Sequence, residues 1–329
     1  MQDRFQRRLE YLRLSVTDFC NLRCRYCMPE TGVKALRHAD ILTYEEMLRV
    51  VRVLAKLGVR KVRLTGGEPL VRCGLLSLVK RLKETPGIET VALTTNGVML
   101  SDVLDDLVAA GLDAVNLSLD TLHAERFARL ARRPMLPQVL TALHLLLAKR
   151  HLTVKVNCVP LRGVNEDELT GIAALARTQP ISVRFIELMP IGCARTAGLS
   201  GLPMAEVRAV FQAAFGALYP VLPERNAPAG PAALFRPAGF SGTIGLIDAI
   251  DHKFCARCNR LRLTADGFLK LCLYSAEGVD LRALLRGGAS DEALREAILS
   301  AVWIKPAEHH FQKEDDEQRD ERAMYQVGG

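Results

Sequence analysis

The amino-acid sequence predicts an α/β fold in which a parallel sheet is covered by crossover helices. From residue 11 onward, short β-rich runs alternate with longer segments that carry apolar residues at helical spacing. This periodicity fits either a doubly wound sheet or a partial barrel. Residues suited to chemistry follow the ends of successive strands, which is where barrels place their active sites. We therefore predict a partial, open TIM-like β/α barrel of about six units, with a smaller C-terminal α+β segment.

The predicted elements follow one another in regular order. Strands are predicted over residues 11–17, 61–65, 90–94, 114–118, 153–159 and 182–187. Between them, helices are predicted over residues 44–57, 75–83, 101–110, 136–150 and 166–176. Thr43, Ser101 and Asn165 each precede acidic residues, so we predict them as helix N-caps.

Residues 220–239 interrupt this order, because prolines, glycines and alanines cluster there without apolar periodicity. We expect a linker or long loop, followed by a C-terminal segment that starts near Phe240. The predicted domains are the barrel over residues 1–222 and a smaller domain over residues 223–329.

Composition limits the possible functions. The 329 residues are 49% hydrophobic and 25% charged, as in a globular protein. No run approaches the roughly 20 apolar residues of a membrane span, and residues 1–8 lack an apolar signal core, so we expect a cytoplasmic protein without membrane contact. A net charge of +7 suits an anionic substrate, weak nucleic-acid contact or plain solubility. Aromatic residues are only 5%, without the interleaved basic residues of a base-stacking surface, so no nucleic acid is expected.

Three cysteines gather on the loop after the first predicted strand: Cys20, Cys24 and Cys27. In a reducing cytosol, cysteines so spaced indicate metal ligands rather than disulfides. One loop can wrap an iron-sulfur cluster, and three ligands leave one iron of a cubane open to another molecule. A structural zinc site or buried thiols are the alternatives, but zinc usually takes four ligands and the nearest downstream histidine is His38.

A Gly-Gly-Glu-Pro run follows the second predicted strand. Gly66 and Gly67 would let the backbone approach a ligand closely, and Glu68 offers an acceptor for an ammonium group. By itself the run indicates only a turn. Ser118 and Asp120, which close the fourth strand, are equally explained as polar residues that face water.

A second trio lies in the C-terminal segment: Cys255, Cys258 and Cys272. Zinc would fit if His252 completed the set, but we favour a second cluster with an open iron. Arg260 and Arg262 alternate with leucines, so in a strand both guanidinium groups would face one side and could grip phosphate oxygens. A solvated strand face is the alternative.

The spacing Cys-x3-Cys-x2-Cys, with Tyr26 before the last cysteine, resembles the signature of the radical S-adenosylmethionine enzymes. The resemblance implies a 4Fe-4S cluster whose open iron is chelated by the methionyl group. An electron then cleaves the sulfonium to give a 5′-deoxyadenosyl radical that abstracts hydrogen. The resemblance also implies an S-adenosylmethionine pocket formed by Tyr26, Gly66, Gly67, Glu68, Ser118 and Met189.

Within that superfamily the chain resembles, nearly end to end, the GTP 3′,8-cyclases of molybdenum cofactor biosynthesis. The residues that carry the resemblance are both trios, 184–190, 258–264 and the terminal Gly328-Gly329. The resemblance implies that the radical takes hydrogen from C3′ of GTP. The C3′ radical then attacks C8, giving (8S)-3′,8-cyclo-7,8-dihydroguanosine 5′-triphosphate, in the first step of the pathway. A second 4Fe-4S cluster would bind the guanine edge.

The resemblance also implies roles for individual residues. Gly328 and Gly329 would reach into the active site and be required for the radical chemistry. The GTP contacts would be Arg13, Arg63, Thr94, Lys155, Arg184, Arg260, Leu261 and Arg262. Phe19, Gln6 and Val327 depart from the residues common in the family, and none of these departures removes a ligand.

The implied partners are GTP, an external electron donor and the cyclic pyranopterin monophosphate synthase that takes the product, with a homodimer possible. Three rival functions stay open: a radical enzyme that modifies peptides and carries an auxiliary cluster, a two-cluster electron carrier, and a zinc-stabilised nucleic-acid binder. Cys73, Cys158 and Cys193 lack ligand spacing and are expected to be ordinary thiols. His309 and His310 are expected to be solvated.

Overall fold

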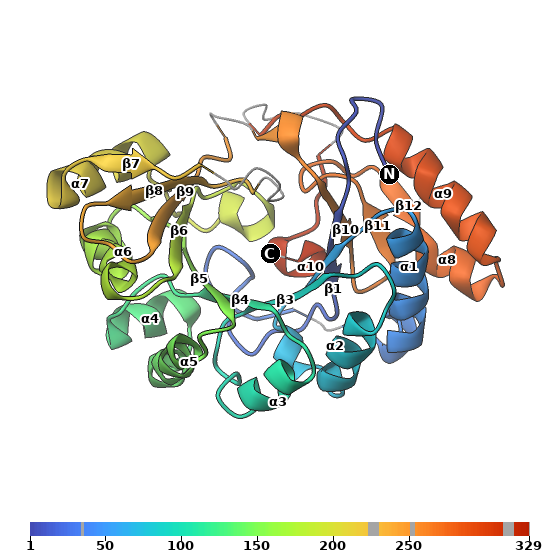
Figure 1. Ribbon diagram of the computed structural model, residues 1–329, viewed down its shortest axis with the longest axis horizontal. Helices are drawn as coiled ribbons and strands as arrows, with labels where there is room; N and C mark the ends of the chain where they lie inside the picture. The colour runs from blue at the N-terminus through green and yellow to red at the C-terminus, as the bar shows by residue number, and fades with distance from the viewer. Residues whose placement is uncertain (34–35, 223–229, 251–253, 312–318, 329) are drawn as a thin grey trace.

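The computed structural model describes residues 1–33, 36–222, 230–250, 254–311 and 319–328. Its sheet is curved, with most helices outside the curve (Figure 1). The strands lie in the order β12-β11-β10-β1-β2-β3-β4-β5-β6-β9-β8-β7. Six consecutive parallel strands form the centre: β1 (Tyr11–Ser15), β2 (Lys61–Thr65), β3 (Thr90–Thr95), β4 (Ala114–Ser118), β5 (Thr153–Cys158) and β6 (Ser182–Ile186).

The C-terminal part of the chain extends both ends of this sheet. β9 (Thr243–Ile247) pairs parallel with β6, and β10 (Arg260–Leu263) pairs parallel with β1. Antiparallel strands complete the two edges: β8 (Ala233–Pro237) and β7 (Leu218–Pro220) beyond β9, and β11 (Phe268–Lys270) and β12 (Gly278–Asp280) beyond β10. The open, partial β/α barrel predicted from the sequence is therefore confirmed.

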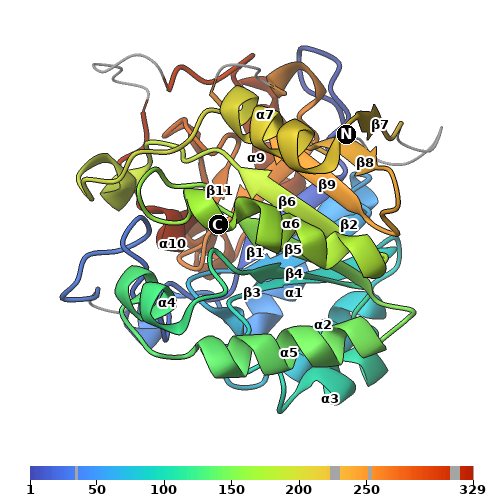
Figure 2. The same cartoon turned by 90° about the vertical axis from the view of Figure 1, so that its left-hand side faces the viewer.

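The helices that follow the strands cover the outer face of the sheet, as the side view shows for α5 and α6 (Figure 2). They are α1 (Tyr44–Lys56), α2 (Leu75–Lys83), α3 (Leu104–Ala109), α4 (Ala124–Ala131), α5 (Leu136–Ala148), α6 (Leu169–Thr178) and α7 (Met204–Phe215). In the C-terminal part, α8 (Leu281–Arg286) and α9 (Asp291–Trp303) lie beside α1, whereas the short α10 (Met324–Val327) lies on the inner side of the sheet (Figure 1). None of the described helices is long and apolar enough to cross a membrane.

Each parallel strand has one apolar face and one polar face. On β2, Val62 and Leu64 are fully buried in the core, whereas Lys61, Arg63 and Thr65 point to the opposite side. Because neighbouring strands are in register, this division continues across the sheet. The outer face packs on the helices, and the inner face is left to carry polar groups.

Most predicted elements are confirmed within one or two residues, with clear exceptions. Thr43 forms a full capping box with Glu46. The cap predicted at Ser101 is wrong, because α3 begins at Leu104. Asn165 caps no backbone amide; its side chain instead accepts a hydrogen bond from the Leu161 backbone amide.

The prediction of a linker or loop over residues 220–239 is wrong in part. β8 forms there and pairs with both β7 and β9, although residues 223–229 lie outside the described residues. The domain boundary at 222/223 stays a prediction, and the sheet runs across it.

The C-terminal tail is fixed to the sheet by a buried ion pair. Lys270 on β11 has no exposed side-chain surface and donates to Asp320, whose side chain is 7% exposed. Asp320→Ala is expected to reduce the free energy of unfolding by about 3–5 kcal/mol, because a buried ammonium group would lose its partner. Glu292→Ala breaks an exposed pair with Arg295 and should cost less than about 1 kcal/mol. Denaturant unfolding measures the free energy of unfolding of both variants. Equal losses in Asp320→Ala and Glu292→Ala would contradict the role of the buried ion pair in fixing the tail.

Candidate active site

The first cysteine trio lies on the loop that leaves the C-terminal end of β1, and the Gly66-Gly67 turn after β2 holds this loop. The Gly67 amide donates to Thr17 O at 2.8 Å, and the Glu68 amide donates to Phe19 O at 2.8 Å. A Cβ atom on Gly67 would lie 2.3 Å from Phe19 O. The two glycines are thus required by close contact with the cysteine loop itself.

The Glu68 carboxylate is turned inward. It is 1% exposed and accepts hydrogen bonds from Thr95 Oγ1 at 2.8 Å and from the Asn96 amide at 2.7 Å. Burial raises its pKa to about 7, although these hydrogen bonds oppose the rise. The carboxylate that we expected to accept from a ligand's ammonium group therefore ties the β2 and β3 loops together. Asn96 in turn donates through Nδ2 to Cys20 Sγ at 3.7 Å.

Tyr26 connects the cysteine loop to the end of β4. Its hydroxyl donates to Asp120 Oδ2 at 2.6 Å, and the other carboxylate oxygen of Asp120 accepts from the Val159 amide at 2.8 Å. Asp120 is therefore not a residue that faces water, whereas Ser118, at the end of β4, is half-buried. The loops that follow β1 to β5 contact one another and form one rim at the C-terminal ends of these strands.

The first trio is a compact set of sulfur donors. Burial raises the pKa of the Cys20 thiol to about 11 and that of the Cys27 thiol to about 12, and it raises that of Cys24 well above its usual value. Backbone amides donate to two of the sulfurs: Leu22 to Cys20 at 3.4 Å, and Tyr325 of α10 to Cys27. Amide donors beside several thiols suit an iron-sulfur cluster, whose thiolates they stabilise.

The inner face of the sheet below this rim is strongly cationic. Its basic side chains come from β1, β2, β5, β6 and β10: Arg13, Lys61, Arg63, Lys155, Arg184, Arg260 and Arg262. Arg63 Nε donates to the Tyr11 hydroxyl at 2.5 Å, and Arg63 Nη1 lies 3.5 Å from Thr94 Oγ1. The cations predicted for anion binding thus lie on one surface.

The pKa values of several groups on this face are shifted, because the groups are buried and their charges lie close together. Burial, then the charges of Arg184 and other cations, lowers the pKa of Lys155 to about 7. Burial lowers the pKa of Arg13 and of Arg184 to about 10, and neighbouring arginines add to both shifts. Burial raises the pKa of Tyr11, but Arg63 and the other cations outweigh it and bring the value to about 7. A polyanion in this space would relieve the repulsion.

Leu261 differs from the two arginines beside it. Its side chain is 1% exposed and belongs to the apolar core, on the opposite face of β10 from Arg260 and Arg262. Only its backbone can face the inner side of the sheet.

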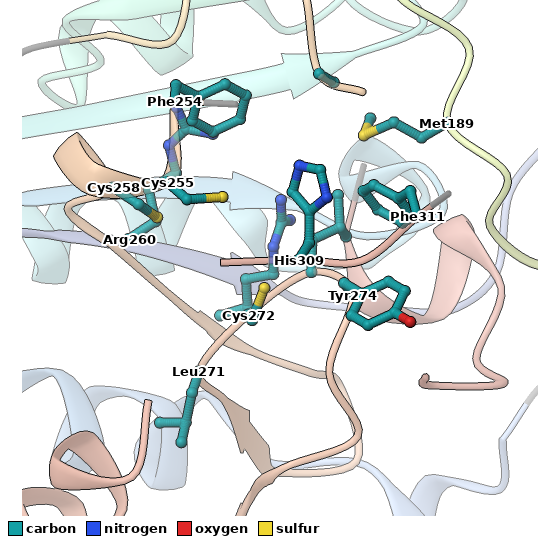
Figure 3. A pocket seen from close by; sticks show the side chains of 13 residues that line it. Met189, Phe254, Cys255, Cys258, Arg260, Leu271, Cys272, Tyr274, His309 and Phe311 are labelled. Carbon is teal, nitrogen blue, oxygen red and sulfur yellow. The ribbon is translucent and has the colours of Figure 1, made fainter. Parts of the chain in front are cut away.

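The second trio lines a cavity at the edge of the cationic face (Figure 3). Its lining includes Cys255, Cys258, Cys272, Met189, Arg260, Arg262, Tyr274, His309 and Phe311. Met189, which the sequence resemblance assigned to the S-adenosylmethionine pocket, thus faces the second trio. His252 lies outside the described residues.

The C-terminal tail enters the same interior. The Gly328 carbonyl accepts from Arg262 Nη1 at 2.6 Å. Gly328 has a φ of +76°, and an added Cβ would lie 2.5 Å from Thr65 Cγ2, so both conformation and space favour glycine. Gly329 lies outside the described residues.

Sequence reasoning missed several residues of this interior. Tyr11, Lys61 and Asn116 all lie on the inner face, and Asn116 is 8% exposed with no hydrogen-bond partner for Oδ1 among the described residues. The available signal was a polar residue at every second position of an apolar strand. The prediction that His309 is solvated is wrong, since it is 5% exposed.

The three remaining cysteines lie in different surroundings. Cys73 is exposed, and Cys158 is fully buried beside Asn165, whose Nδ2 lies 3.8 Å from its sulfur. Cys193 is half-buried and close enough to Cys27 to raise the pKa of that thiol. Across the described residues, no three His, Cys, Asp or Glu side chains are gathered around the position of a single metal ion.

Comparison with known proteins gives matches over the whole chain. A family model of the radical SAM superfamily matches residues 14–176, and the model named Molybdenum Cofactor Synthesis C matches residues 181–311. The GTP 3′,8-cyclases of Moorella thermoacetica and Pelotomaculum thermopropionicum are 46% and 47% identical to it, with 100% of both chains covered. Streptococcus suis SuiB bound to its precursor peptide SuiA has a similar fold, with a TM-score of 0.62 at 14% identity over 92% of this chain and 66% of SuiB.

Gly67→Ala tests the contact between the glycine turn and the cysteine loop. Because the new methyl group would collide with Phe19 O, the loop must move, and the first trio should lose its iron. After anaerobic reconstitution, the iron content should fall by about four atoms per chain, the content of one cubane. Gly171→Ala is the control, since no atom lies within 4 Å of its added Cβ. Equal iron content in Gly67→Ala and Gly171→Ala would show that iron binding by the first trio does not depend on this contact.

Proposed function

We infer the function of this chain from one premise: it belongs to the GTP 3′,8-cyclase family of radical S-adenosylmethionine enzymes. It is a GTP 3′,8-cyclase of molybdenum cofactor biosynthesis that uses a 4Fe-4S cluster and S-adenosylmethionine. The bound cluster and S-adenosylmethionine supply the radical that takes hydrogen from C3′ of GTP before C3′ bonds to C8. The cationic inner face is the observation that carries this conclusion, because its basic side chains can bind the triphosphate of GTP below the rim.

Cys20, Cys24 and Cys27 hold the first cluster in this proposal. Three sulfur donors, two of which accept hydrogen bonds from backbone amides, support the assignment. The surrounding rim would hold S-adenosylmethionine through Tyr26, Gly66, Gly67, Glu68, Ser118 and Met189. Glu68 contributes by fixing the rim, because its carboxylate is already engaged by Thr95 and Asn96. Met189 lines the cavity of the second trio, so in this proposal it would contact S-adenosylmethionine from the side of that cavity.

Cys255, Cys258 and Cys272 hold a second 4Fe-4S cluster. Three cysteine sulfurs that line one cavity support this assignment, because thiolates are the usual ligands of iron-sulfur clusters. When bound, this cluster would supply an iron that no cysteine ligates as the binding position for the guanine edge of GTP. Arg260 and Arg262 line the same cavity, so the nucleotide would extend from it onto the cationic face.

The triphosphate lies on the cationic face. Fork-shaped guanidinium groups and an ammonium group match phosphate oxygens, and burial together with the neighbouring cations lowers the pKa of Lys155. The proposed contacts are Arg13, Arg63, Thr94, Lys155, Arg184, Arg260, Arg262 and the backbone of Leu261. Gly328 and Gly329 would be required for the radical chemistry, and the hydrogen bond from Arg262 to the Gly328 carbonyl supports a role of the tail in this interior.

The remaining partners follow from the reaction. An external donor must supply the electron, and cyclic pyranopterin monophosphate synthase takes the cyclised product. We place the enzyme in the cytoplasm, where cysteines stay reduced, and expect a homodimer. A peptide-modifying activity gains no support from SuiB, because that likeness concerns the fold alone.

Cys255→Ala tests whether the first trio serves cleavage of S-adenosylmethionine and the second trio serves binding of GTP. Anaerobic wild-type protein with GTP, S-adenosylmethionine and dithionite should give 5′-deoxyadenosine and a cyclised nucleotide by mass analysis. The variant should lose the cyclised nucleotide by more than a hundredfold and still cleave S-adenosylmethionine, an order-of-magnitude expectation for loss of substrate positioning. Cys73→Ala, at an exposed thiol, should behave as wild type. Unchanged cyclisation in Cys255→Ala would overturn the second-cluster assignment.

The affinity for GTP should fall as pH rises above 7. Lys155 loses its positive charge and Tyr11 gains a negative one as pH passes their pKa of about 7, so both changes disfavour the triphosphate. Binding must then take up protons, and the Kd should rise by up to about tenfold per pH unit for each proton. Lys155→Arg and Tyr11→Phe should each flatten the profile measured by anaerobic equilibrium dialysis from pH 7 to 9. An unchanged slope in both would exclude these groups.

A further inference from the structure

The segment after α9, residues 305–311, is fastened to the loops that carry the second cysteine trio. Lys305 is 1% exposed, although its side chain ends in a charge. Its Nζ donates to Arg260 O at 3.2 Å and to Leu271 O. Arg260 lies two residues after Cys258, and Leu271 immediately precedes Cys272. Lys305 therefore fixes the segment to two of the three cysteine positions.

Arg7 fastens the same segment to the third cysteine. Its Nη1 donates to Cys255 O at 3.0 Å and to Ala307 O at 2.8 Å, and its Nη2 donates to Pro306 O at 2.7 Å. Asp3 accepts from Arg7 Nε at 2.6 Å and balances its charge. Arg7 and Lys305 thus hold residues 305–311 against the loops that carry the trio.

This fastening brings His309 into the cavity of the second trio. Figure 3 shows its imidazole projecting into the cavity, with the sulfurs of Cys255 and Cys272 directed toward the same space. The ring lies 4.5 Å from Phe311 and 6.4 Å from Tyr274, measured between centroids. The backbone amide of His309 also donates to the Cys255 sulfur. Its position is defined by packing on one side and by the cysteine loop on the other.

Imidazole nitrogen is an established iron ligand, and histidines replace cysteines on one iron of some iron-sulfur centres. The three cysteines leave one iron without a protein ligand, and His309 lines the cavity that would contain that iron. His310, its neighbour in sequence, does not line the cavity; it lies 4.0 Å from Glu308 with its side chain 35% exposed. Of these two adjacent histidines, His309 lines the cavity and His310 does not, so His309 is the one placed to ligate the iron.

We propose that His309 ligates the open iron of the second cluster whenever the nucleotide is absent. This inference rests on the proposed second cluster. An iron-nitrogen bond forms with one nitrogen of the neutral imidazole, while the other nitrogen keeps its proton. GTP binding breaks that bond, and the guanine takes the vacated position. Exchange of one ligand for another keeps the iron protected between turnovers.

The test uses full-length protein labelled with ¹⁵N-histidine, reconstituted anaerobically and reduced, without GTP or S-adenosylmethionine. Pulsed electron paramagnetic resonance detects a nitrogen nucleus bound to a paramagnetic cluster. We expect a ¹⁵N coupling in the labelled protein, a ¹⁴N coupling in the unlabelled protein, and loss of both on addition of GTP. His310→Ala should keep the coupling, and His309→Ala should lose it while retaining about eight irons, the content of two cubanes.

The outcomes separate this inference from the proposed function. About eight irons with signals from both clusters, but no histidine coupling in the labelled wild-type protein, would overturn ligation by His309 and leave the second cluster intact. A coupling that persists in His309→Ala would also overturn it. About four irons in the wild-type protein would remove the second cluster and the inference together. If His309→Ala failed to fold, the absence of a coupling in the labelled wild-type protein would still overturn the inference.

Discussion

Repulsion among buried cations on the inner face of the sheet is the constraint on which the rest of this structure depends. The helices cover the apolar outer face, so stability of the core does not require the inner face to be apolar. Arg63, Lys155 and Arg184 make no ion pair with a carboxylate among the residues the structure describes. Such an arrangement is costly in the free protein and is offset when a polyanion binds.

The C-terminal part of the chain completes the interior from both ends of the sheet. β9 and β10 add parallel strands beside β6 and β1, and β10 brings Arg260 and Arg262 to the cationic face. The tail then returns to that face, where Gly328 contacts Arg262. A barrel of six units alone would lack these groups, so the two regions recognised by different family models form one site.

Local sequence patterns predicted the parts of this structure that local forces determine. Strict alternation marked β2, and a capping box marked the start of α1. The cysteine trios were evident from spacing alone. β8 (Ala233–Pro237) was missed because its strand conformation depends on pairing with β7 and β9, which no local pattern records.

Long-range contacts determine the surroundings of Glu68 and His309. Local patterns did not predict that Thr95 and Asn96 donate hydrogen bonds to the Glu68 carboxylate. His309 was expected in solvent, but Arg7 and Lys305 draw its segment into the protein. The surroundings of both residues depend on hydrogen bonds between positions 27 or more apart in the sequence, which local patterns do not reveal.

The central claim is that two clusters, each with one open iron, face one cationic interior. Electron paramagnetic resonance of the reduced, anaerobic protein tests it most directly. S-adenosylmethionine should alter the signal of one cluster, and GTP, added separately, should alter the signal of the other. Zinc in place of iron, or signals that neither ligand changes, would contradict the account.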